Sequence, residues 1–367
     1  MSITQFIRRI SRAVMALAAG LAFANAGSAA NAPAAQLTVH HPRVQEVMAV
    51  QEEFTPGLMA LEEILGTAVG QDDDGDVTML IFVNSEAKNL GEVMRALPPS
   101  LRGVRVKAHL TEPFRAMAGR PGGGVSHKAK QTTPIQLGTS GGWRYDLANG
   151  YCCGGTLGSL VQKGGTQYIL SNYHVFEADI VEGGNNRMAA AGDPVIQPGL
   201  IDVSCNAANA QEVATLSGIK SLPGSNVDAA IAAVVSGMVR DDGAILEIGT
   251  ISAQTVGASL NQAVKKSGRT TGLTRSTVSG LNATVSVAYD NECAGGAAFT
   301  KTFTGQILIK NRGSSFLNSG DSGSLMVEDV ATNPRAVGLL FAGSSSVAVA
   351  NPIGEVLAFF EATMVGN

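Results

Sequence analysis

The feature that most constrains the fold is a succession of short apolar runs that begins near Gly142 and continues almost to the C-terminus. Short apolar runs separated by Gly, Asn and Pro are typical of β-strands joined by turns. The chain also has 44 glycines and only 5% aromatic residues, which suits short strands better than helical bundles. The runs are GTLGSLV, QYILSNYHV, DAAIAAVV, AILEIGTI, ATVSVAY, GQILIK, GSLMV and AVGLLFAG. Residues 142–363 are therefore predicted to be all-β, with enough chain for two small barrels.

Residues 37–118 form a block in which helical and strand patterns both occur. Apolar residues at helical spacing in 44–54 predict a helix, and Pro56 is expected to interrupt it because proline lacks a backbone N–H. The other expected elements are strands at 64–69 and 77–83, a helix at 89–97 and a strand at 104–110. A compact α+β domain is predicted.

The acidic segment QDDDGD, residues 71–76, joins two of these strands and could suggest a calcium loop. It lacks the alternating acids and the closing glutamate of an EF-hand. A solvated hairpin turn is therefore the expectation.

Both ends of this first block carry signals of export and processing. Residues 8–12 (RRISR) precede the apolar run AVMALAAGLAFA, a pattern typical of a signal peptide, assigned here to residues 1–30. Candidate cleavage points follow Ala26, Ala30 or Ala32. No later apolar stretch reaches the length of a membrane span, so we expect a secreted protein, extracellular or periplasmic, without a stable membrane anchor. Residues 119–141 are predicted to be a Gly-rich, cleavable linker.

Charge and cysteine content narrow the possible partners. The formal net charge of -4 and the pI near 5.8 show no basic excess, so nucleic acid is not an expected partner. Export permits disulfides, and four cysteines allow three connectivities. A bridge between the adjacent Cys152 and Cys153 is the least favourable geometrically, so Cys205 and Cys293 are each expected to pair with one of them. Zinc-ligand spacings are missing, and we expect neither metal nor cofactor.

The segment Gly320-Asp321-Ser322-Gly323 stands directly before an apolar run. Such a segment is either a tight β-turn or a nucleophilic serine held on a strained backbone. A serine nucleophile needs a histidine as general base, and that histidine needs an orienting carboxylate. His174, at the end of an apolar run, is the one histidine of the β-rich region; the others are His40, His41, His109 and His127.

Among the aspartates between His174 and Ser322, Asp228 is the candidate orienting carboxylate. It opens the apolar run DAAIAAVV, which places its side chain at the start of a core strand. A buried carboxylate needs a hydrogen-bond donor, and an imidazole N–H is suitable. The other aspartates have polar or Gly-rich surroundings: Asp179, Asp193, Asp202, Asp241, Asp242 and Asp290.

Three segments, SNYHV around His174, NVDAAIA around Asp228 and NSGDSGSLMV around Ser322, resemble the active-site segments of the chymotrypsin/trypsin-like serine proteases. The segments SGRTTGLTRSTVSG (267–280) and AVGLLFAGSSS (336–346) further resemble bacterial members, so the likeness covers 142–363. The resemblance implies a chymotrypsin-like double barrel and a serine endopeptidase acting on polypeptides. It implies nucleophilic attack by Ser322, proton transfer by His174, orientation by Asp228, and an oxyanion hole formed by the N–H groups of Gly320 and Ser322.

The resemblance also indicates a substrate pocket. Its floor would be set by Phe316 and one wall by the strand that carries Phe341 to Gly343, and neither offers an acidic side chain. Small or medium apolar residues are therefore expected at the cleaved position. In many relatives Asp321 would pair with a newly cut N-terminus of Ile-Val-Gly-Gly type, and no such sequence follows the linker.

Two alternatives to the endopeptidase remain open: a catalytically inactive, protease-like binding module and a serine esterase using the same triad. The N-terminal block is either a zymogen propeptide, which assists folding or covers the active site, or a permanent accessory domain.

Overall fold

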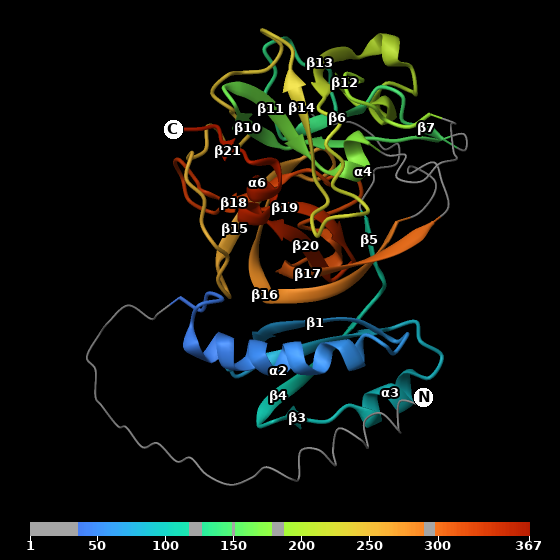
Figure 1. Cartoon of the computed structure of the whole chain (residues 1–367), viewed down its shortest axis with the longest axis vertical. Coiled ribbons are helices and arrows are strands. Elements are labelled where there is room, and N and C mark those ends of the chain that lie inside the picture. The colour runs from blue at the N-terminus through green and yellow to red at the C-terminus, as the bar shows by residue number, and fades with distance from the viewer. Residues whose placement is uncertain (1–35, 117–126, 149–150, 178–186, 290–297) are drawn as a thin grey trace, which may run out of the picture.

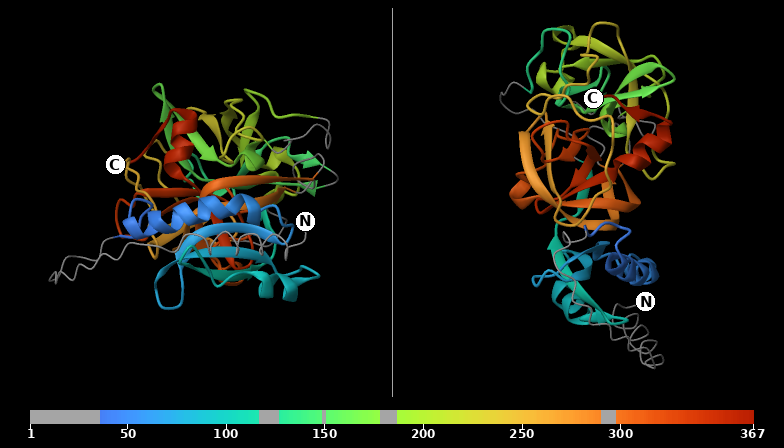
Figure 2. Two further views of the ribbon diagram at one scale, coloured as in Figure 1. Left: turned by 60° about the horizontal axis from the view of Figure 1, so that its bottom comes forward. Right: turned by 90° about the vertical axis from the view of Figure 1, so that its left-hand side faces the viewer.

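The computed structural model describes residues 36–116, 127–148, 151–177, 187–289 and 298–367; the expected signal peptide, 1–30, lies outside these ranges. None of the helices within them is long and apolar enough to cross a membrane. The views in Figure 1 and Figure 2 show an N-terminal α+β domain at one end of two β-rich bodies.

The N-terminal domain is a helix packed on a small sheet. Its elements are α2 (Pro42–Leu58), β1 (Ile64–Gln71), β2 (Val77–Asn84), α3 (Leu90–Ala96), β3 (Ser100–Leu101) and β4 (Val104–Thr111). β1 pairs antiparallel with β2, and β2 pairs parallel with β4. Buried Val44, Val47 and Val50, spaced three residues apart, form the inner face of α2. The α+β character is as expected.

The expectation that Pro56 interrupts the first helix is wrong. α2 continues to Leu58, and the N–H of Met59 still donates to the carbonyl of Thr55 at 2.8 Å. Proline is tolerated there because it lies in the last turn, where the missing N–H removes one hydrogen bond and few residues follow.

The acidic segment 71–76 forms the hairpin turn between β1 and β2, as expected. Its carboxylates face two basic side chains of β4. Arg105 pairs with Asp72, Asp74 and Asp76, and Lys107 pairs with Asp73 at 2.6 Å. Ion pairs at this exposure contribute little to stability, so the turn is a solvated loop whose four carboxylates are partly neutralised by two basic side chains.

The C-terminal body is a closed six-stranded barrel. β15 pairs with both β18 and β16, and this closes the ring. In the order of pairing the strands are β15 (Ala263–Gly268), β18 (Leu325–Glu328), β19 (Ala336–Gly343), β20 (Val347–Pro352), β17 (Phe299–Lys310) and β16 (Gly272–Tyr289).

The other body is a second curled sheet of eight strands. Two barrel-like sheets of this kind give the all-β, chymotrypsin-like double barrel that the sequence predicts. In the order of pairing its strands are β21 (Thr363–Met364), β10 (Ser159–Lys163), β11 (Thr166–Ser171), β14 (Ala230–Val234), β13 (Gln211–Leu216), β12 (Pro194–Gln197), β6 (Thr139–Trp143) and β9 (Gly155–Leu157). The remaining elements are α4 (Tyr173–Phe176), α6 (Ile353–Phe360), the hairpin of β7 (Leu147–Ala148) and β8 (Tyr151–Cys152), and 3-10 turns at Leu200–Asp202, Ala207–Asn209 and Arg312–Ser314.

The N-terminal domain joins the C-terminal barrel through main-chain pairing. β1 pairs antiparallel with β16, with Gly66 opposite Val285, so one sheet of eleven strands runs through both domains. A short strand, β5 (Phe114–Ala116), then lies between β16 and β19. Figure 1 shows β5 rising from the N-terminal domain into the barrel region.

The run 244–251 and the cysteines of the β-rich region differ in how well they match expectation. The run 244–251, of which four apolar residues are buried, forms turns and single β-bridges instead of a strand, because Gly243 and Gly249 adopt positive φ angles and reverse the chain. The expected bridging of the vicinal cysteines holds for Cys152, which is bonded to Cys205. Cys153 is also disulfide-bonded, and its expected partner, Cys293, lies outside the described residues.

Candidate active site

His174 and Asp228 belong to the eight-stranded body, called the first barrel below, and they meet where it contacts β16 and β20 of the C-terminal barrel. His174 lies on the short helix α4, which follows β11, and Asp228 lies two residues before the neighbouring strand β14. The Nδ1 of His174 lies 2.6 Å from Oδ2 of Asp228, and both side chains are buried. An ionised carboxylate accepts only, so Nδ1 carries the proton and Nε2 is the basic nitrogen. Nε2 has no hydrogen-bond partner among the described residues.

Asp228 is held by further donors. Its Oδ1 accepts from the N–H groups of Tyr173 (2.8 Å) and His174 (3.3 Å), and its Oδ2 also accepts from the hydroxyl of Tyr289 at 2.8 Å. The side-chain oxygen of Asn351 accepts from the Asp228 N–H at 2.9 Å. A buried carboxylate with this many donors has its acceptor sites satisfied and its orientation fixed.

Ser322 lies in the turn before β18 and is fully buried. Its Oγ donates to the carbonyl oxygen of Phe341 at 3.3 Å and not to His174. The serine turn and α4 nevertheless flank one glycine. A Cβ added at Gly155 would lie 2.9 Å from the Ser322 carbonyl oxygen and 2.6 Å from a methyl group of Val175, the neighbour of His174.

Glycines shape the turn around Ser322. Gly320 has φ +95° and Gly323 has φ +90°, a region that residues with a side chain rarely adopt. A Cβ at Gly320 would also lie 2.6 Å from the hydroxyl of Thr270. The carbonyl of Gly320 accepts from the Thr156 hydroxyl at 2.9 Å. Residues from outside the turn, Thr156 and Thr270, therefore hold its backbone in place.

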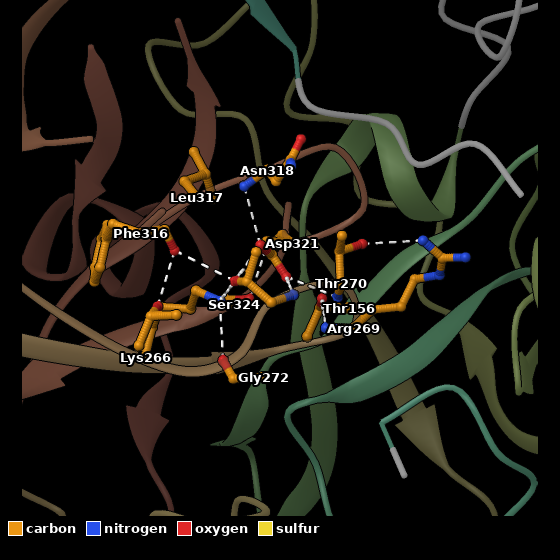
Figure 3. Close-up of polar contacts among 12 residues, drawn as sticks. Thr156, Lys266, Arg269, Thr270, Gly272, Phe316, Leu317, Asn318, Asp321 and Ser324 are labelled. Carbon is orange, nitrogen blue, oxygen red and sulfur yellow. Dashed lines mark hydrogen bonds and ion pairs between the residues drawn. The ribbon is translucent and has the colours of Figure 1, made fainter. Parts of the chain in front are cut away.

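The carboxylate of Asp321 anchors the same turn, and Figure 3 shows its polar contacts. It accepts from the N–H groups of Thr270 (2.8 Å), Thr271 (3.1 Å) and Asn318 (3.0 Å), and from the hydroxyl of Thr271 (2.7 Å). The ammonium of Lys266, on β15, lies 3.4 Å from Asp321 Oδ2, and neither side chain is exposed to solvent. The cation that balances Asp321 therefore comes from within the chain.

Lys266 is held by more than its charge. Its ammonium donates to the hydroxyl of Thr271 and to the carbonyl of Gly272, the latter at 3.0 Å. Burial lowers the pKa of Lys266, and the neighbouring Asp321 opposes that shift. Next to it, Arg269 forms a two-pronged ion pair with Asp202, with both distances 2.6 Å.

A further buried acid, Glu177, lies at the end of α4. Burial raises the pKa of its carboxyl to about 7, and Lys220 partly offsets the effect. Glu177 is therefore partly protonated near neutral pH, three residues from His174.

The predicted substrate-pocket residues lie in the C-terminal barrel. Phe316 is buried in the hydrophobic core, and its carbonyl accepts from the hydroxyl of Thr274 at 2.9 Å. The ring of Phe341 packs against that of Phe303, with 4.9 Å between centroids. Gly343 is paired with Arg115 of β5, so a strand of the N-terminal domain covers this edge.

A large cavity lies elsewhere. It has a volume of about 1200 Å³ and is lined by α2 residues such as Met48 and Gln51 and by barrel residues such as Leu281 and Ile307. None of the predicted site residues lines it, so it plays no part in the site. Within the described ranges, no group of three or more His, Cys, Asp or Glu side chains could hold a metal ion.

Sequence reasoning placed His174 and Asp228 together, and the structure brings them into contact. Two buried groups next to the site were not predicted from the sequence. Tyr289 donates a hydrogen bond to Asp228, and Lys266 forms an ion pair with Asp321. The second had a signal in the sequence, since Lys266 interrupts a strand run directly before the segment 267–280.

Comparisons with known proteins give a family model and distant structural neighbours. The model of the Nal1 C-terminal domain matches residues 225–350, a range that contains Asp228 and Ser322 but not His174. No curated protein matches the chain.

Among the solved structures that resemble this chain are bacterial serine proteases of chymotrypsin type. Protease A of Thermobifida fusca is 20% identical, with a TM-score of 0.42, over 64% of this chain and 99% of its own. Cellulomonas bogoriensis chymotrypsin is 20% identical, with a TM-score of 0.38, over 64% and 99%. A glutamic-acid-specific serine protease, described as using a histidine triad in substrate binding, is 19% identical, with a TM-score of 0.40, over 63% and 100%. At this low sequence identity and TM-score, the similar structures assign no role to any residue of this chain.

Proposed function

We propose that this chain is a secreted serine endopeptidase that cleaves polypeptides through His174, Asp228 and Ser322. The observation that carries the proposal is the buried contact of 2.6 Å between His174 and Asp228, which leaves the other imidazole nitrogen free of protein partners among the described residues. A histidine arranged in this way is suited to serve as a general base. Ser322, on a glycine-shaped turn near α4, is the candidate nucleophile.

The mechanism begins with rotation of the Ser322 side chain away from the Phe341 carbonyl and toward Nε2 of His174. Ser322 Oγ then attacks the peptide carbonyl as Nε2 takes its proton, and Asp228 stabilises the resulting imidazolium. The N–H groups of Gly320 and Ser322 would stabilise the negative charge on the carbonyl oxygen. His174 returns the proton to the leaving amine, and water hydrolyses the acyl-enzyme by the same steps.

Two further features support the proposal. The anchoring of Asp321 by Lys266 supports a serine turn that is ordered without a newly cut N-terminus. The apolar character of Phe316 and Phe341 supports a preference for small or medium apolar residues at the cleaved position.

The test is labelling by a fluorophosphonate probe, applied to the intact protein and to protein cleaved within 119–126. We expect an adduct on Ser322 in the cleaved form that disappears in His174→Ala and Ser322→Ala. The matched control is Ser319→Ala, a serine of the same turn, which should still be labelled. Absence of labelling in both forms would favour the inactive binding module, and turnover of esters without turnover of peptides would favour the esterase.

We further propose that the N-terminal domain inhibits the active site in the intact chain. β5 pairs antiparallel with β19, with Ala116 opposite Ala342 and Arg115 opposite Gly343. A peptide that adds a strand to a sheet edge uses the same main-chain groups. Beside it the Thr111 hydroxyl lies 2.6 Å from that of Ser344. A substrate strand would have to displace β5 from this edge.

Phe114 gives a direct test of this inhibition. Its ring is fully buried and lies 5.8 Å from that of Phe82, so truncation to Ala should weaken the seating of β5 by about 3 kcal/mol. We expect the intact Phe114→Ala variant to be labelled by the probe up to about a hundredfold faster than the intact parent.

The control for this test is Phe54→Ala, which truncates a partly buried ring of α2 in the same domain but away from β5. Its labelling rate should stay close to that of the parent. Labelling of the intact parent as fast as the cleaved form would show that the domain is an accessory module and not an inhibitor.

A further inference from the structure

Tyr289 is the last residue of β16 and is buried, with 2% of its surface exposed. Its hydroxyl donates to Oδ2 of Asp228 at 2.8 Å, and this same oxygen lies 2.6 Å from His174 Nδ1. We propose that Tyr289 is a positioning residue of the active site, which fixes the Asp228 carboxylate and limits how strongly it attracts the proton of His174. This inference rests on the proposed function, because it assigns Tyr289 to the triad of that reaction.

The ring of Tyr289 is fixed on several sides. It stacks on Phe299, with centroids 4.8 Å apart and an interplanar angle of 3°, and lies edge-on to the His174 ring at 6.0 Å. Phe303 lies at 6.5 Å. With its ring held in this way, the hydroxyl is directed at Asp228. Burial, and then the Asp228 charge, raise the pKa of Tyr289 well above its usual value, so the hydroxyl remains a donor at all pH values of interest.

The hydrogen bonds of Asp228 divide evenly between its two oxygens. Oδ1 accepts from two backbone N–H groups, whereas Oδ2 accepts from the His174 imidazole and the Tyr289 hydroxyl. Removing the hydroxyl leaves Oδ2 with the imidazole alone. The carboxylate then attracts the imidazolium more strongly and is less restrained in rotation, so the apparent pKa of His174 should rise and its alignment should loosen.

Three titratable side chains of the described residues lie near His174. Asp228 faces it from the segment just before β14, Tyr289 faces it from the end of β16, and Glu177 directly follows the last residue of α4. Glu177 has a pKa raised to about 7 and therefore titrates in the range where His174 is measured. The comparison should accordingly be repeated in the Glu177→Gln background, which removes that titration.

The experiment compares the protein with Tyr289→Phe, which keeps the ring and removes only the hydroxyl. In the cleaved form we expect kcat to fall about tenfold with little change in KM, because a hydrogen bond to a charged group is lost at the reacting dyad. The acid limb of kcat/KM should move to higher pH. The control Phe299→Leu disturbs the stack but keeps the hydroxyl, and should lower the rate without moving the acid limb.

A second readout does not depend on turnover. The His174 imidazole can be titrated by NMR in the intact protein, with its signal identified by its loss in His174→Ala. A higher pKa of His174 in Tyr289→Phe, also in the Glu177→Gln background, supports the inference even if no substrate is hydrolysed, in which case the proposed function alone fails. An unchanged pKa together with a kcat within twofold of the parent overturns the role of Tyr289.

Discussion

We expect the replacement of Asp228 by Asn to lower kcat on a peptide substrate by about ten-thousandfold and to change KM by much less. The reason lies in the hydrogen bonds of the buried dyad. Oδ2 of Asp228 accepts from His174 Nδ1 and from Tyr289 while Oδ1 accepts from two backbone N–H groups, so every contact of this side chain calls for an acceptor. An amide has only one acceptor oxygen. With the oxygen on the backbone N–H groups, the amide NH₂ faces Nδ1, stabilises the tautomer protonated at Nε2, and removes the general base.

The matched control is Asp193→Asn. Asp193 is a largely buried aspartate of the first barrel that accepts from the indole of Trp143 at 3.1 Å and has no contact with His174 in the described structure. Its kcat should stay within a few-fold of the parent value. Thermal unfolding of both variants would show whether a loss of activity is a loss of fold. A decrease of less than tenfold in folded Asp228→Asn would contradict the assignment of Asp228 as the orienting carboxylate.

The dyad was predictable from the sequence because both partners stand at the ends of apolar runs. His174 follows one run and Asp228 opens another, and adjacent antiparallel strands bring such ends together. Tyr289 had no comparable signal. In the run ATVSVAY it alternates with other side chains of a strand, and its hydroxyl meets Asp228 only because β16 extends to 18 residues and reaches back to the first barrel.

In the N-terminal domain, too, the secondary-structure elements were predictable from the sequence and their long-range pairing was not. Its helix and strands follow from apolar periodicity, and α2, β1, β2 and β4 lie close to their expected ranges. The pairing of β1 with β16 was not predictable, since an edge strand carries no sequence mark of its partner. The pairing of β5 with β16 and β19 was not predictable either. Its three residues, Phe114 to Ala116, are too few to be recognised as a strand from the sequence alone.

Replacing Lys266 by Met should destabilise the fold by about 3 kcal/mol, because it leaves the buried Asp321 carboxylate without a cation. Asp321 keeps the hydrogen bonds from Thr270, Thr271 and Asn318. The expected loss in the free energy of unfolding is therefore at the lower end of the range for a broken buried ion pair. The loss can be measured by denaturant unfolding of the intact protein. Adding Asp321→Asn to Lys266→Met should recover part of it, since the unpaired charge is gone.

Replacement of Lys265, the neighbour of Lys266 on β15, is the control. It distinguishes the effect of a lost ion pair from the effect of losing any buried lysine. The ammonium of Lys265 donates to the carbonyl of Val330 at 2.7 Å, and the residue is also buried, but the carbonyl that accepts this hydrogen bond is uncharged. Lys265→Met should therefore cost clearly less than Lys266→Met. The two variants should also differ at the serine turn. Without Lys266, the unpaired Asp321 carboxylate is expected to move toward solvent, and the N–H groups of Gly320 and Ser322 then lose their alignment. Probe labelling of Ser322 in the cleaved form of Lys266→Met should therefore slow at least tenfold. Equal losses of stability and equal labelling rates in the two variants would show that the ion pair does not hold the turn.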